Sequence, residues 1–234
     1  MKALITFLII SSLLFAACSD SPNTPQQQQG PPQIPERVAV QLALPANAPQ
    51  AVKTYLNSTF ILYNTLFNLF DVVRNNPAQG THPNWSWQAD FDPWQLIVQA
   101  MTLSEQKSEW KVILNGSGLE NWLSSTGIIQ AGGATGEWTF YLFDSETIDA
   151  TSSWSRDAQG ALVVTTLLHE RPQTERAAVL IDITGRADNS GELLVRDENG
   201  NTILTANWDA SGAGVWAAYD ASSGQQTGSG TWRS

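Results

Sequence analysis

From residue 84 to the C-terminus, apolar and polar residues alternate with period two, and short turn signals cut the pattern into segments. Such alternation is typical of β-strands with one buried face, because successive side chains point to opposite faces of a sheet. Division at the turns predicts strands at 84–91, 94–103, 108–115, 120–129, 137–143, 150–156, 161–169, 176–184, 191–197, 202–209, 213–220 and 228–233.

The links between these segments are only a few residues long, so neighbouring strands are expected to pair antiparallel as an up-and-down meander. Asn199-Gly200 is the strongest turn signal, because both residue types tolerate the positive φ of a type I′ hairpin. A sheet of so many strands does not lie flat. The sequence therefore predicts a mainly β fold that curls into a barrel or a curved half-barrel.

One long N-terminal amphipathic helix is predicted over residues 48–75, where apolar residues recur at helical spacing. Asn47 is placed to cap it, Pro49 falls in the first turn, and Asn75-Asn76-Pro77 ends it. A core helix covered by the sheet is favoured over a helix lying on a membrane surface. Its only basic residues are Lys53 and Arg74, whereas membrane-surface helices usually carry a basic face.

The first eighteen residues have the pattern of an export signal: Met1-Lys2, an apolar run to Leu14, then Ala16-Ala17-Cys18. The ending resembles the bacterial lipobox, which implies cleavage before Cys18, acylation of that cysteine with diacylglycerol and palmitate-type chains, and a stable membrane anchor. The alternative is an ordinary signal peptide with a chance cysteine. Cys18 is the only cysteine in the chain, which also excludes a disulfide framework.

A Pro/Gln-rich stretch without apolar periodicity follows Cys18 and predicts an extended tether. The domain organisation is therefore a signal peptide at 1–17, the lipidated cysteine plus tether at 18–36, and a single helix-plus-β-meander domain at 37–234. Ser19, by resemblance to the sorting rule of enterobacterial lipoproteins, implies the outer membrane. The periplasmic or surface side is left open.

Composition and motifs argue against several functions. The formal net charge of −10 leaves no basic stripe for nucleic acid. His82 and His169 lie far apart in the sequence, and no motif for a nucleophile, a phosphate loop or a metal site is present. The acidic group Asp144, Glu146 and Asp149 is interpreted as solvated, and so is Asp182. We therefore predict a non-enzymatic protein with no catalytic residue, no metal and no cofactor beyond the covalent lipid on Cys18.

Ten tryptophans are the remaining unusual feature. The phrase G-x-W-x-x-Y occurs at residues 136–141 and again at 214–219, and a further tryptophan follows each after the same interval. Hairpin geometry is sufficient to explain this weak repeat. The ten tryptophans could line an apolar cavity or stack on sugar rings, and core packing is the alternative for each of them. The candidate ligand-binding residues are Trp138, Tyr141, Trp154, Trp208, Trp216 and Trp232.

The predicted order of a long apolar helix, then a curved meander, on a lipid anchor resembles the LolA/LolB-type lipoprotein carriers. That resemblance is architectural and implies a lipid or other apolar ligand held between sheet and helix. The sequence therefore predicts an outer-membrane lipoprotein that binds an apolar ligand or lipid. The alternative is an envelope lipoprotein that binds a glycan or another envelope protein, or that has a structural role.

Overall fold

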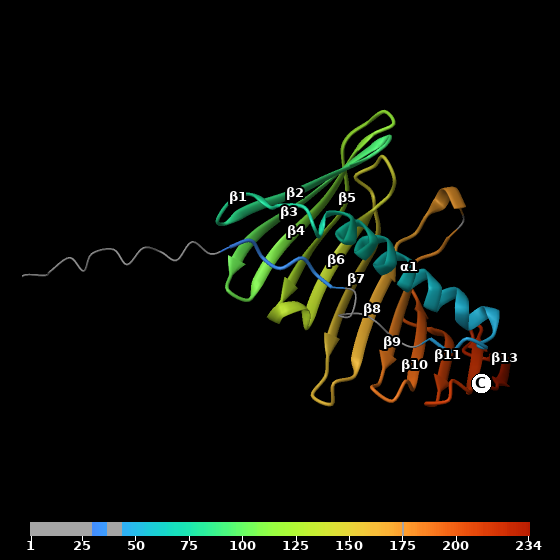
Figure 1. Cartoon of the computed structure of the whole chain (residues 1–234). Coiled ribbons are helices and arrows are strands. Elements are labelled where there is room, and N and C mark those ends of the chain that lie inside the picture. The colour runs from blue at the N-terminus through green and yellow to red at the C-terminus, as the bar shows by residue number, and fades with distance from the viewer. Residues whose placement is uncertain (1–29, 37–43, 175) are drawn as a thin grey trace, which may run out of the picture.

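The computed structural model describes residues 30–36, 44–174 and 176–234, so the predicted leader and Cys18 lie outside the described residues. One helix, α1 (Gln50–Val73), is followed by a single antiparallel sheet of 13 strands (Figure 1). The strands are β1 (Gln79–Thr81), β2 (Asn84–Phe91), β3 (Trp94–Ser104), β4 (Lys107–Gly116), β5 (Leu119–Gln130), β6 (Thr135–Tyr141), β7 (Ile148–Arg156), β8 (Leu162–Leu168), β9 (Val179–Gly185), β10 (Gly191–Asp197), β11 (Thr202–Trp208), β12 (Gly214–Tyr219) and β13 (Gln226–Trp232).

The strands follow one another across the sheet in sequence order, which confirms the predicted meander. All twelve predicted strands are present with small shifts of their ends, and only β1, three exposed residues long, was not predicted. β1 and β13 do not pair, so the sheet is open and the closed-barrel alternative is wrong. Its apolar face is covered by α1 instead of by opposite strands (Figure 1).

The helix forms where its apolar spacing predicts it, but its start differs. The N-cap is Pro49, with no side-chain cap, so the predicted cap at Asn47 is wrong. A turn in which the Ala48 amide donates to the Pro45 carbonyl over 3.2 Å precedes the helix and places Asn47 outside it. The buried residues of α1 recur every three or four positions: Val52, Leu56, Thr59, Phe60, Tyr63, Leu66, Phe67, Phe70 and Val73.

This stripe packs on the sheet through aromatic contacts. The ring of Tyr63 lies edge-on to Trp154 at 5.6 Å between centroids, and Phe70 contacts Trp110 and Trp138 at 5.7 Å each. The helix contacts β2 and β3 at one end and β9 and β10 at the other, so it crosses the strands of the sheet. Among the described residues, no helix is both long and apolar enough to span a membrane.

A small hydroxyl network lies inside this otherwise apolar layer. Tyr63 donates to Ser152 over 2.8 Å, and the Ser152 and Thr166 hydroxyls lie 2.6 Å apart. Burial raises the pKa of Tyr63 far above its usual value of 10.0, although the bond with Ser152 acts in the opposite direction. The phenol therefore stays neutral and ties α1 to β7.

Candidate functional site

The predicted ligand-binding tryptophans lie largely in the core. Trp138, Trp154, Trp208 and Trp232 are only 2–8% exposed and face the helix side of the sheet. Each lies directly across from a glycine on the preceding strand, Trp138 from Gly127 within β5. The other three occupy equivalent positions, across from a glycine that closely follows a turn: Gly136 with Trp154, Gly191 with Trp208, and Gly214 with Trp232.

In these pairs the indole lies over the bare glycine backbone. A Cβ on Gly136, Gly191 or Gly214 would lie 2.2–2.3 Å from the opposite ring. The indole N–H then donates to a carbonyl of the turn before that glycine: Trp154 to Gly133 over 3.0 Å, Trp208 to Asn189 over 3.1 Å, and Trp232 to Gly212 over 2.7 Å. The weak sequence repeat thus reflects a register that the strand pairs β6–β7, β10–β11 and β12–β13 share. In each pair, the tryptophan covers the turn that precedes the opposite glycine.

The other two predicted residues are half-buried and lie apart. Trp216 covers Gly230 and Gly228 of β13 on the helix side of the sheet. The Tyr141 hydroxyl lies 3.5 Å from the Thr126 hydroxyl on the opposite face, where Thr126 and Thr139 pair. The six candidates therefore do not line one common cavity, and of the six only Trp154 lines the best-formed cavity, which lies at one end of the sheet.

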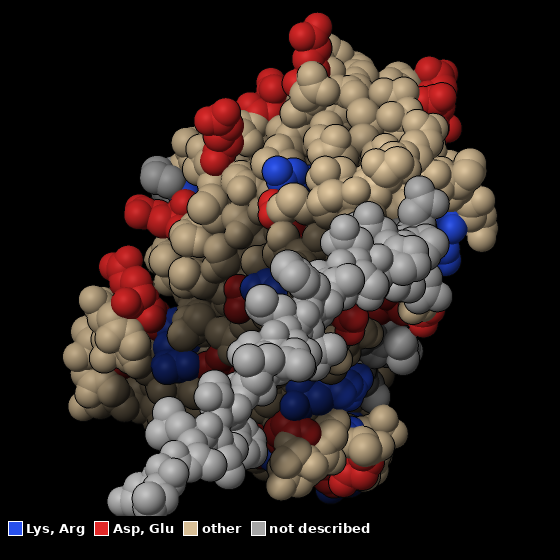
Figure 2. Space-filling model, turned by 90° about the vertical axis from the view of Figure 1, so that its left-hand side faces the viewer, with Lys and Arg blue, Asp and Glu red and all other residues tan. Residues whose placement is uncertain are grey.

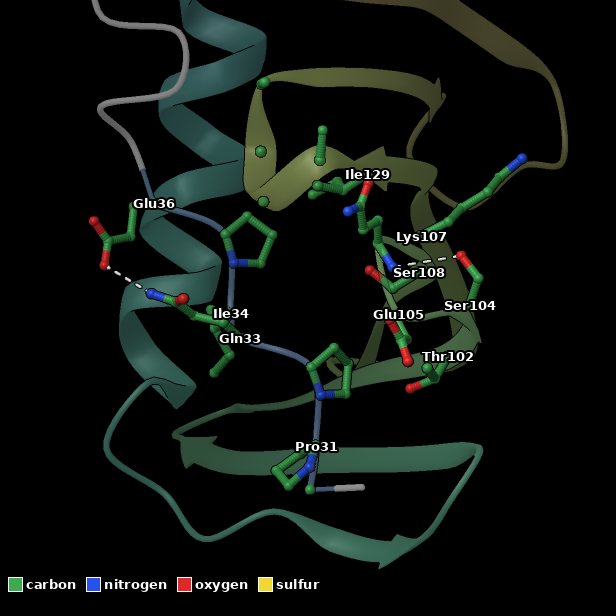
Figure 3. Close-up of a pocket in the computed structure, with 18 of the residues that line it drawn as sticks. Pro31, Gln33, Ile34, Glu36, Thr102, Ser104, Glu105, Lys107, Ser108 and Ile129 are labelled. Carbon is green, nitrogen blue, oxygen red and sulfur yellow. Dashed lines mark hydrogen bonds between the residues drawn. The ribbon is translucent and has the colours of Figure 1, made fainter. Parts of the chain in front are cut away.

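That cavity, which we call the end cavity, has a volume of about 810 Å³. Residues 30–36 form one wall, and the turns β3–β4 and β5–β6 form the opposite walls (Figure 3). The apolar part of its lining is Pro31, Pro32, Ile34, Pro35, Ile129, Ala131, Ala134 and Trp154.

The wall formed by residues 30–36 is anchored to the fold. Ile34 is 6% exposed and belongs to the apolar core. The Arg74 guanidinium, at the end of α1, donates to the carbonyl of Ile34 over 3.3 Å and to that of Pro35 over 2.9 Å. The same guanidinium also pairs with Asp71 at 3.0 Å. The last part of the predicted tether therefore lies against the domain and shapes the cavity.

Charged groups surround the apolar lining of the end cavity. Lys107 and Arg156 line it together with Glu36 and Glu105. Arg156 donates to the Gly160 carbonyl over 3.2 Å, which holds its guanidinium at the end of β7. In Figure 3, Lys107 and Glu105 stand on the side opposite the wall that carries Pro31 and Ile34. Such a cavity suits a ligand with an apolar body and a polar end.

Sequence reasoning missed most of these residues. Ile34 was assigned to the tether, while Lys107 and Ala134 are single residues at hairpin ends, where no periodicity marks them. The isolated glycines Gly132 and Gly133, which build the β5–β6 turn, were the only local signal.

A second hollow lies on the face of the sheet away from the helix. This outer trough has a volume of about 570 Å³ and crosses β4 to β9. It combines carboxylates with hydroxyls and a few aliphatic side chains: Glu109, Glu137, Thr126, Thr139, Thr151, Ser153, Thr165, Ile128, Leu167 and Leu180. Within the described chain, Glu109 has one ion pair, with Lys111 at 3.7 Å.

The carboxylates singled out in the sequence have different environments. Asp149 is 9% exposed and ion-paired with both Arg171 and Arg176, so its predicted solvated state is wrong. Burial alone would raise the pKa of Asp149, but hydrogen bonds and positive charge from the two arginines outweigh burial and lower it. Asp182 accepts a bond from Thr165 over 2.7 Å and pairs with Arg196 on the outer face.

In Figure 2, acidic side chains protrude along much of the outline of the face, and acidic and basic side chains lie together in its hollowed middle. The described residues contain no cluster of three or more potential metal ligands. No protein-family model matches the sequence, and the search of curated proteins finds no relative.

Proposed function

We propose that this protein is an outer-membrane lipoprotein, anchored through Cys18, that binds an apolar or lipid-like ligand without catalysing a reaction. The observation that carries the ligand proposal is the end cavity. Its volume of about 810 Å³ falls within the range of small-molecule sites, roughly 300–1,000 Å³. Its lining of proline, isoleucine and tryptophan beside the charged groups of Glu36, Glu105, Lys107 and Arg156 favours an amphipathic ligand with a polar end.

The position of this cavity along the chain supports access from a membrane. Cys18 precedes Gly30, the first residue of the wall, by 30 − 18 = 12 residues. Twelve residues span at most about 43 Å when fully extended. An anchor at Cys18 would therefore hold Gly30, at the edge of the cavity, within about 43 Å of the lipid surface. The arrangement of one helix across a single open sheet is the part of the carrier resemblance that this proposal retains.

Native mass spectrometry of the full-length protein, extracted from the producing membrane, tests the proposal. We expect an added mass that organic extraction identifies as lipid. Ala134→Trp narrows the cavity from an exposed turn and should remove most of that mass without disturbing the core. Ala158→Trp, in the exposed β7–β8 turn outside the lining, is the matched control and should retain the ligand. Equal loading of both variants, or an empty wild-type protein after incubation with membrane lipids, would contradict the proposal.

The outer trough favours the glycan-binding alternative. Carboxylates and hydroxyls above aliphatic side chains can hydrogen-bond sugar hydroxyls and cover the apolar face of a sugar ring. Ile128 faces this trough, whereas its neighbour Ile129 faces the helix side. Ile128→Trp should weaken glycan binding on an array and leave lipid loading unchanged. Unchanged glycan binding in this variant would contradict a glycan site in the trough.

A further inference from the structure

The last strand leaves one edge of the sheet open. Among the described strands, β13 pairs only with β12, and Figure 1 places it at the far end of the sheet. Its seven residues therefore present backbone N–H and C=O groups on one side without a strand partner. Such an edge is a template for another strand.

The five central residues of β13 read the same in both directions about Ser229, whereas its end residues are Gln226 and Trp232. Its central residues are Thr227-Gly228-Ser229-Gly230-Thr231. If two copies align antiparallel with Ser229 opposite Ser229, Thr227 meets Thr231, and Gly228 meets Gly230. Threonine pairs across antiparallel strands are favourable, and no like charges meet, because β13 contains no charged residue.

β13 has little of the usual protection of edge strands. Edges are commonly blocked by a short strand, a proline, a lysine or a bulge. The opposite edge of this sheet fits that description, since β1 has only three residues. β13 has seven residues and contains neither proline nor lysine. Its one bulge, at Thr227, where the register with β12 steps from Gly228 to Gln226, lies near the start of the strand and leaves Gly228 to Trp232 regularly paired.

The helix side of this edge has an apolar side chain to bury. Trp216 lies over Gly228 and Gly230 and packs against the apolar core, but it is only half-buried. In the antiparallel alignment, Gly228 and Gly230 of the second copy would lie beside the same glycines of the first. The surface of backbone without side chains on which each Trp216 lies would then be wider. Pairing would thus add backbone hydrogen bonds and cover Trp216 at the same time.

We propose that β13 is a homodimerisation edge: two copies of this chain join antiparallel about Ser229 into one continuous sheet. Two chains anchored in the same membrane would meet at a raised effective concentration, which favours a contact as small as one strand pair. This inference does not depend on which ligand the end cavity holds.

Cysteine cross-linking of the full-length protein in its membrane tests both the contact and its register. Directly opposed residues have Cα atoms about 4.5–5.5 Å apart, which suits a disulfide. Ser229→Cys should form a covalent dimer on mild oxidation. Thr227→Cys alone should not, because its copies would be four residues out of register, roughly 13 Å apart along the strand. Thr227→Cys mixed with Thr231→Cys should cross-link, and the wild-type protein gives the background from Cys18.

Charge variants provide the second readout in detergent solution. Ser229→Lys and Ser229→Glu each place like charges at the two-fold axis on an exposed position, so each alone should run as a monomer while the wild type shows twice the monomer mass. An equimolar mixture of the two should restore the dimer. A monomeric wild-type protein, or equal cross-linking of Ser229→Cys and Thr227→Cys, would overturn the proposal.

Discussion

At the scale of single residues, the glycine–tryptophan pairs explain why the chain holds so many tryptophans. Each indole needs a neighbour without a side chain, because the helix closes the space above it. We expect Gly214→Ala to lower the free energy of unfolding by about 1–3 kcal/mol, the usual cost of overpacking. Its Cβ would lie 2.3 Å from the Trp232 ring and 2.4 Å from the Asn207 carbonyl oxygen.

Thermal or urea unfolding measures this cost. Gly30→Ala is the matched control, because its Cβ would meet nothing within 4 Å, and its stability should equal that of the wild type. If Gly214→Ala were equally stable, the tryptophan would have room to move, and the cross-strand pair would not define the packing.

Asp149 is the residue whose charge matters most for the fold. Its pKa is lowered in the folded state from the ordinary 3.8, so the unfolded chain binds a proton more readily. The stabilisation is complete well above pH 4 and is lost as the pH falls through the folded-state pKa. We expect Asp149→Asn to cost about 1–3 kcal/mol at pH 7, since both arginines lose their charged partner.

Unfolding curves at pH 7 and pH 3 check this expectation. The loss in Asp149→Asn should shrink at pH 3, because the unfolded carboxyl, with its ordinary pKa of 3.8, is then mostly protonated and the folded carboxylate contributes less stability. Asp144→Asn, an exposed change in the loop that precedes β7, should leave stability unchanged at both pH values. An identical deficit of Asp149→Asn at both pH values would show that packing, and not charge, holds the two arginines.

At the scale of elements, periodicity predicts the strands and the helix well, because one face of each is buried and the other is not. The type of a turn is predicted less well from its dipeptide sequence. The Asn199-Gly200 turn is not type I′: only Gly200 has a positive φ, of 84°. The Asp197 carboxylate accepts the amides of Asn199 at 2.9 Å and Asn201 at 2.8 Å, which fixes a longer loop. The side-chain acceptor overrides the dipeptide preference.

The helix is the element on which the fold most depends. Phe70 is fully buried between Trp110 and Trp138, so Phe70→Ala should destabilise the protein by about 3–5 kcal/mol. Ile61→Ala, at a position 64% exposed, should change stability by less than about 0.5 kcal/mol. Denaturant unfolding, monitored through tryptophan emission, measures the stability of both variants. A similar loss in both would mean that helix propensity, and not packing, governs the stability of α1.

At the scale of the whole molecule, the sequence predicts a meander but not where it stops or which face it leaves open. Closure depends on whether the first and last strands meet, and no local pattern encodes that distance. The end cavity is equally hard to predict from the sequence. Its walls come from residues 30–36, two turns and the end of β7, which are distant in sequence. Only Trp154, which also belongs to the core, was identified beforehand.

An open meander has a further consequence, because each strand depends mainly on its two neighbours. The helix contacts β2 and β3 as well as β9 and β10, so much of its packing does not depend on β12 and β13. In a chain that ends at Asp209, Trp208 would keep its contacts with Gly191 and Asn189. We therefore expect this shortened chain to unfold cooperatively at a reduced temperature and to remain monomeric. Deletion of residues 44–76 should instead abolish the transition, since it uncovers the apolar face. Loss of cooperative unfolding in both shortened chains would show that the sheet is stable only as a complete unit.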